Sequence, residues 1–148
     1  MPETSYTRIM REHDEIEMLS GRLSNLVRDR AADPHVLADA LRHLKELVSD
    51  HLDHEDALLE TLAARSGTAA QRDRIARAEQ EFCVLKENWQ RFTRAWDATA
   101  IAADRSGFDQ STLAMLPRLR DRVRLESELL MALAMLERSN SVSPSAGE

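Results

Sequence analysis

Apolar residues recur at intervals of three and four along most of this chain, which is the spacing of an amphipathic helix. The pattern predicts four helices, near residues 5–30, 34–66, 69–104 and 110–137. Asp33-Pro34 suits the start of the second helix, and Ser66-Gly67 suits its end. Because long amphipathic helices with short connections pack antiparallel, we expect an all-α, up-and-down four-helix bundle.

The apolar stripes also predict which side chains form the core. The residues that we expect to be largely buried are Leu44, Val48, Phe82, Trp89, Leu119, Val123 and Leu130. Ser106-Gly107 is expected to end the third helix, and Pro117 to kink the fourth helix or to mark its restart. Residues 139–148 are small and polar, so we expect one domain over residues 1–138 followed by a flexible tail.

Composition narrows the classes of protein that this chain can belong to. Its 148 residues carry a net charge of −6 with acids and bases mixed, which does not favour a nucleic-acid partner. It has no run of 18 apolar residues and no apolar signal-peptide segment, so we expect no membrane span and a cytoplasmic location. A single cysteine, Cys83, excludes an internal disulfide framework. Glycine-rich phosphate loops and nucleophile motifs are absent, which disfavours an enzyme; a homodimer is compatible with the sequence, and no protein partner is indicated.

Polar side chains interrupt the apolar stripes at four places. His13 lies between Ile9 and Ile16, and the centre of the second helix's stripe holds His51 and Glu55, one turn apart. Glu126 lies at the centre of the last helix's stripe. Acids are almost never buried unless a cation meets them, and imidazole and carboxylate together suit iron, manganese or zinc. These four residues are therefore the candidate metal ligands.

A second interpretation of the same residues needs no metal. A single histidine on an apolar face is more often a hydrogen-bonded core residue than a ligand. Arg122, one turn before Glu126, offers a permanent positive charge that could neutralise Glu55 and Glu126. The other histidines, His35, His43 and His54, are expected in solvent or at the rim of the site, and Cys83 is expected to be half-buried.

Three segments carry a resemblance to a known family: REHDEIEML, DHLDHEDALLE and RVRLESELL. They resemble the hemerythrin-like (HHE cation-binding) family, whose members are four-helix bundles that hold non-haem iron, usually two ions, through histidines and carboxylates. The resemblance implies that His13, His51, Glu55 and Glu126 are the matching ligands. It also implies handling or sensing of oxygen, nitric oxide or peroxide.

The chain departs from the family pattern at two ligand positions. Phe82 stands where the third helix is expected to contribute a histidine, and Arg122 stands where the fourth is expected to do so. The resemblance therefore implies a reduced site for one or two ions, with iron as the first choice and zinc or manganese as the others. The alternative is a bundle with no cofactor, structural or protein-binding, in which Arg122 replaces the metal charge.

Overall fold

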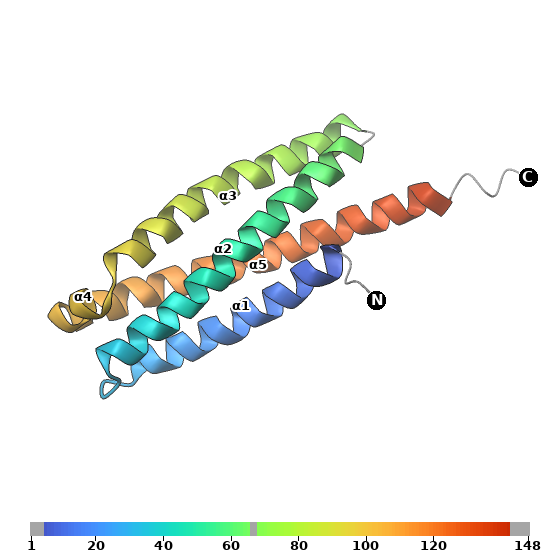
Figure 1. Cartoon of the computed structure of the whole chain (residues 1–148). Helices are drawn as coiled ribbons and strands as arrows, with labels where there is room; N and C mark the ends of the chain where they lie inside the picture. Colours follow the sequence, from blue (N-terminus) through green and yellow to red (C-terminus); the bar gives the residue numbers. More distant parts are fainter. Residues whose placement is uncertain (1–4, 66–67, 143–148) are drawn as a thin grey trace, which may run out of the picture.

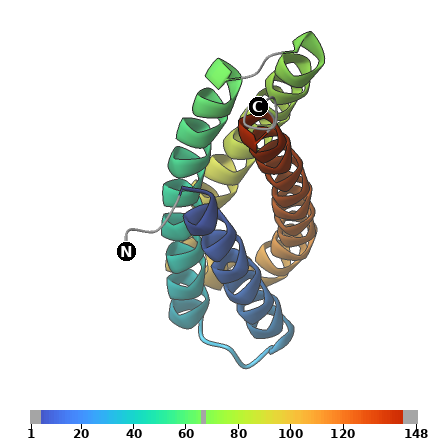
Figure 2. The same cartoon turned by 90° about the vertical axis from the view of Figure 1, so that its right-hand side faces the viewer.

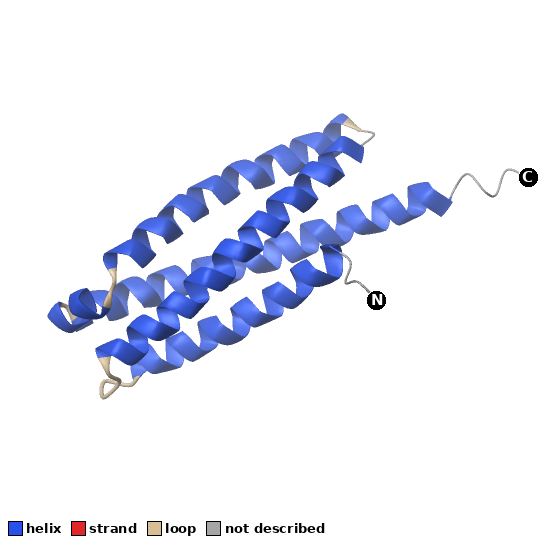
Figure 3. Ribbon diagram, viewed as in Figure 1, coloured by secondary structure: helices blue, strands red, loops and turns tan. Residues whose placement is uncertain are grey.

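Four long helices form the bundle in this computed structural model, which describes residues 5–65 and 68–142 (Figures 1 and 3). The helices are α1 (Ser5–Arg28), α2 (Pro34–Arg65), α3 (Ala69–Ala95), the short α4 (Ala98–Ala103) and α5 (Arg105–Val142). Consecutive long helices run antiparallel, and around the bundle α1 contacts α2 and α5 while α3 completes the ring between α2 and α5 (Figure 2). The predicted all-α bundle is confirmed.

The predicted core is also confirmed. All seven residues expected in the core are buried, each with at most 4% of its surface exposed. They come from α2, α3 and α5, and α1 adds Ile16 and Leu23, which are fully enclosed. The stripes further include side chains that lie outside the described part of the structure: Leu58, Leu59, Leu62, Leu133 and Leu136.

The end of the third helix was predicted wrongly, because α3 ends at Ala95 rather than near residue 104. The short helix α4 follows, and Ser106-Gly107 lies in the first turn of α5 instead of ending a helix. The Asp104 carboxylate accepts a hydrogen bond from the Gly107 N–H at 2.9 Å and so caps α5. A Cβ atom at residue 107 would lie 2.2 Å from this carboxylate, so glycine leaves room for the capping side chain.

Helix α5 runs without interruption through Pro117, so the predicted restart does not occur. The proline ring removes the N–H that the Leu113 carbonyl would accept. Both residues are exposed, so water can take the place of this hydrogen bond. The helix continues past residue 138 to Val142, whereas residues 66–67 and 143–148 lie outside the described part. None of the described helices is both long and apolar enough to cross a membrane.

Arg105 fixes α5 against the end of α1. Its Nη1 and Nη2 groups donate hydrogen bonds to the carbonyls of Ala32 and Asp29, each at 2.9 Å. Its Nε group pairs with Asp109 one turn further along α5, at 2.8 Å. Carbonyls after a helix C-terminus lack partners within the helix, so this guanidinium supplies them. The contact sets the relative position of the two helices that carry His13 and Glu126.

Candidate metal centre

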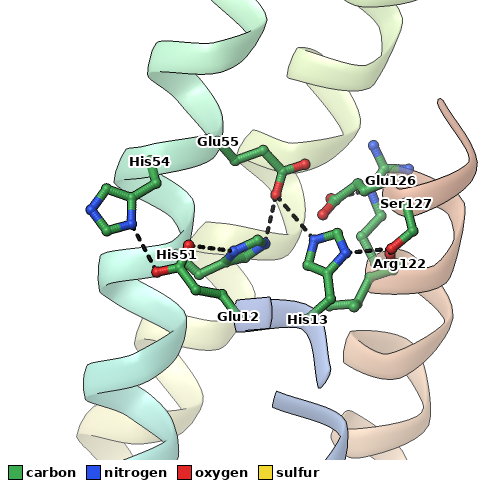
Figure 4. A network of polar contacts seen from close by, with 9 residues as sticks. Glu12, His13, His51, His54, Glu55, Arg122, Glu126 and Ser127 are labelled. Atoms are coloured by element: carbon green, nitrogen blue, oxygen red, sulfur yellow. Dashed lines mark hydrogen bonds and ion pairs between the residues drawn. The ribbon is translucent and has the colours of Figure 1, made fainter. Parts of the chain in front are cut away.

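Four buried polar side chains meet in the interior of the bundle. They are His13 from α1, His51 and Glu55 from α2, and Glu126 from α5, each at most 3% exposed (Figure 4). One nitrogen or oxygen atom of each lies within 4.8 Å of the corresponding atoms of the other three. The structure thus brings together all four residues that the sequence singled out, whereas α3 contributes none to this group.

Glu55 lies at the centre of this group. Its Oε2 atom is 2.7 Å from Nε2 of His51 and 3.7 Å from Nε2 of His13. The two imidazole rings meet edge to face, with their centroids 4.4 Å apart. Because His51 and Glu55 are one helical turn apart, α2 alone presents both side chains on the same face.

The group fits a metal ion better than it fits a set of mutual hydrogen bonds. Nε2 of His13, Nε2 of His51 and both oxygens of Glu55 are buried without a well-directed hydrogen bond to any described residue. Buried polar atoms are rarely left in this state. Four donor atoms around one tetrahedral ion at about 2.1 Å lie roughly 3.4 Å apart. The longest separation in the group, at most 4.8 Å, would therefore shorten by at most about 1.4 Å on binding. Two imidazoles and two carboxylates are a common donor set for such ions.

Hydrogen bonds on the far side of the ring orient His13. Its Nδ1 atom makes a short hydrogen bond with Oγ of Ser127, and this hydroxyl donates to the Val123 carbonyl at 3.0 Å. Since the hydroxyl proton is used in that way, the Ser127 oxygen accepts from Nδ1–H of His13. The lone pair of Nε2 therefore points toward Glu55, as a metal ligand requires.

Glu12 lies behind the ring of His51, as Ser127 lies behind the ring of His13. Its side chain is buried, and its carboxylate lies 3.5 Å from Nδ1 of His51 and 2.8 Å from Nδ1 of His54. Sequence reasoning missed Glu12 and Ser127. A signal for Glu12 was present, because it is three residues after Ile9 and four before Ile16 and so shares their stripe.

Arg122 lies beside the group, on the side of α3. Its Nε atom donates to Glu126 at 3.1 Å, Nη1 to Glu81 at 2.5 Å, and Nη2 to the Ala78 carbonyl at 2.9 Å. The guanidinium carbon is 5.4 Å from the centre of the Phe82 ring. Of the two central acids that Arg122 was expected to neutralise, it contacts only Glu126. Among the described residues, the close partners of Glu55 are the two imidazoles and the carboxyl group of Glu126.

The two central carboxyl groups have opposite pKa shifts. Burial, reinforced by the negative charge of Glu55, raises the pKa of Glu126 to about 11, although Arg122 opposes this shift. Burial also acts to raise the pKa of Glu55, but its close contacts with the His13 and His51 imidazoles outweigh it and hold that pKa below its usual value. Without a metal ion, the two carboxyl groups therefore hold one proton between them, and this proton is on Glu126. A cation bound between the two carboxylates would replace that proton.

The remaining candidates lie outside the group. His35 and His43 are exposed, and the His54 side chain is 40% exposed at the rim, as predicted. Cys83 is exposed, so the expectation of a half-buried thiol was wrong. It follows Phe82 by about 100° around α3, which is enough to turn its side chain away from the core.

Comparison with known proteins adds one finding to this geometry. No curated protein and no solved structure matches the chain. The model of one family, described as the hemerythrin HHE cation-binding domain, matches residues 4–134, which include all four residues of the buried group. The chain therefore belongs to the hemerythrin HHE cation-binding domain family.

Proposed function

We propose that this protein binds a metal ion in the bundle core, with His13, His51, Glu55 and Glu126 as ligands. The observation that supports this most directly is the convergence of four buried donor side chains, three of which, His13, His51 and Glu55, have inward atoms without well-directed hydrogen bonds. Membership of a cation-binding family supports the same conclusion. Iron is the first choice, and zinc and manganese accept the same donors.

The donor set favours one ion rather than two. Two imidazoles and two carboxylates complete a four-coordinate shell for a single ion, and water can add to it. Phe82 and Arg122 lie on the α3 side of Glu126, where a second ion would need further ligands. The guanidinium is 3.1 Å from Glu126, so a second dication on this side would meet a permanent positive charge at close range.

We further propose that the protein handles or senses oxygen, nitric oxide or peroxide. Bound iron would supply a redox-active centre with coordination positions open to such ligands. The surrounding residues exclude bulk water, because Leu52, Phe82 and Val123 are buried next to the donors. Addition of each of these small molecules to the iron-loaded protein should change its visible spectrum, and an unchanged spectrum with all three would contradict this role.

Elemental analysis tests the proposal for metal binding. Protein purified without chelators or a histidine tag should contain close to one iron, zinc or manganese per chain. His51→Ala and Glu55→Ala should each lower that content, whereas His43→Ala, on the same helix but exposed, should not. Protein that holds no metal even after incubation with all three ions would refute the proposal.

The alternative is a bundle without metal, structural or protein-binding, in which ion pairs stabilise the buried acids. The contact between Arg122 and Glu126 favours this alternative, as does the proton that burial keeps on Glu126, because either one removes the need for a metal charge at this acid. In this alternative, the Nε2 atoms of His13 and His51 have no metal ion to bind and remain without a well-directed hydrogen bond. A chain that unfolds at the same temperature with and without added metal would favour it.

A further inference from the structure

Glu12 is a buried carboxylate outside the four-residue group. It lies on α1, next to His13 in the sequence, and its side chain is 7% exposed. Its described partners are two histidines of α2, with Oε1 facing His51 and Oε2 facing His54 (Figure 4). A buried carboxylate costs free energy unless partners compensate it. The two imidazoles therefore offset the free-energy cost of burying the Glu12 carboxylate.

His51 lies between two carboxylates, one at each ring nitrogen. Glu55 is 2.7 Å from Nε2, and Glu12 is 3.5 Å from Nδ1. A neutral imidazole carries one N–H, so the two acids compete for it. If the proton is on Nε2 it faces Glu55, and the remaining lone pair, on Nδ1, points toward Glu12 and away from the metal site. If it is on Nδ1 it faces Glu12, and Nε2 is free to bind.

We infer that Glu12 is a positioning residue for the metal centre: it accepts the Nδ1–H of His51 and so keeps the Nε2 lone pair directed at the ion. This inference rests on the proposed function. Histidines that bind metal commonly donate their other N–H to a carboxylate, which fixes the tautomer and strengthens the ligand. The 3.5 Å contact is long for a hydrogen bond, and it leaves room for the ring to settle toward Glu12 once Nε2 binds.

His54 holds Glu12 in place for this role. It follows His51 by three residues, so both rings lie on neighbouring parts of the same α2 surface. Its Nδ1–H donates to Oε2 at 2.8 Å, which turns Oε1 toward His51. The equivalent support for His13 is Ser127, so each imidazole ligand is fixed from behind by a different residue.

Metal affinity of two Glu12 variants tests the inference. Zinc is added to chelator-treated full-length protein, and its affinity is measured by competition with a chromophoric chelator. Glu12→Leu removes the acceptor and should weaken binding about 10–100-fold. Glu12→Gln keeps one oxygen that can accept from His51, so it should recover part of the loss. Glu15→Leu and Glu15→Gln are matched controls on α1, since Glu15 pairs with Arg11 at the surface.

The outcomes separate the inference from the proposed function. If the unmodified protein binds zinc and Glu12→Leu binds it equally tightly, the inference is wrong and the proposed function stands. Equal losses in Glu12→Leu and Glu12→Gln would also overturn it, because the retained oxygen would then have no value. If Glu12→Leu fails to fold, His54→Ala, which alters a partly exposed residue, should still weaken zinc binding in the same direction. An unmodified protein that binds no metal would refute both.

Discussion

Replacement of Glu126 by glutamine should make the metal-free protein more stable at alkaline pH than the unmodified chain. The pKa of Glu126 is raised to about 11 by burial and by the charge of Glu55. The folded chain therefore keeps a proton on this group across the neutral range, whereas the unfolded chain releases it near the ordinary value of 4.5. Glutamine has the shape of the neutral acid and never has to bind that proton.

The size of the effect follows from proton linkage. A group whose pKa is raised on folding gives its full stabilisation below the unfolded pKa and loses it as the pH rises toward the folded one. Between these limits, the free energy of unfolding of the unmodified chain should fall by up to about 1.4 kcal/mol per pH unit relative to Glu126→Gln. From pH 6 to pH 9 the difference should grow by at most about 4 kcal/mol. Glu55, whose pKa is lowered, contributes a constant amount in this window, because its stabilisation is lost only at acidic pH.

Urea denaturation followed by circular dichroism measures this difference. Both proteins are treated with a chelator and unfolded at several pH values from 6 to 9, and the difference in free energy is plotted against pH. Groups remote from residue 126 have the same surroundings in both chains and cancel in the difference. Parallel pH dependences for the two proteins would refute the assignment of a proton to Glu126. With metal present the trend should reverse for the unmodified chain, because the ion and the proton compete for the same carboxylate.

Three further predictions follow from the core and the site. Trp89→Ala should lower the free energy of unfolding by about 3–5 kcal/mol, measured by denaturation, because the side chain is 1% exposed; a loss below about 1 kcal/mol would contradict its place in the core. Arg122→His should raise the affinity for iron or zinc, measured by chelator competition, because it adds an imidazole one turn from Glu126 and removes a positive charge. An unchanged affinity would argue against an ion on this side of Glu55. Gly107→Ala should destabilise the start of α5, seen as a lower melting temperature, because the new methyl group would collide with the Asp104 cap; an unaltered melting temperature would mean that the cap contributes little.

The apolar stripes were sufficient to predict the central group. His13, His51, Glu55 and Glu126 each replace an apolar residue on the inner face of a helix, and position on that face is set by the helical repeat alone. The repeat says nothing about which atoms of neighbouring helices face each other. Glu12 and Ser127 act across helix pairs, on Nδ1 atoms whose directions depend on side-chain torsions, so their contacts emerged only in the structure.

The helix boundaries near residue 104 show a different limit. Ser106-Gly107 is ambiguous in sequence, because glycine can follow a helix end or accommodate a capping side chain at a helix start. The Asp104 side chain decides between these uses, and the short helix α4 between two capping aspartates was too brief to give a periodic signal. For Arg122, the charge and its neighbour Glu126 were predictable, whereas Glu81 and the Ala78 carbonyl became its partners through the packing of α3 against α5.

The exposed thiol of Cys83 gives the molecule a built-in attachment point for a probe. It is the chain's single cysteine, so a thiol-reactive dye would label one known position without any substitution. Its neighbour in the sequence, Phe82, belongs to the buried surroundings of Glu126 and Arg122. A fluorophore on the outside of α3 would therefore be attached to the helix that borders the candidate centre, and a coloured transition-metal ion bound there would quench its emission. Loading of the bundle with metal can then be followed in real time on the native sequence.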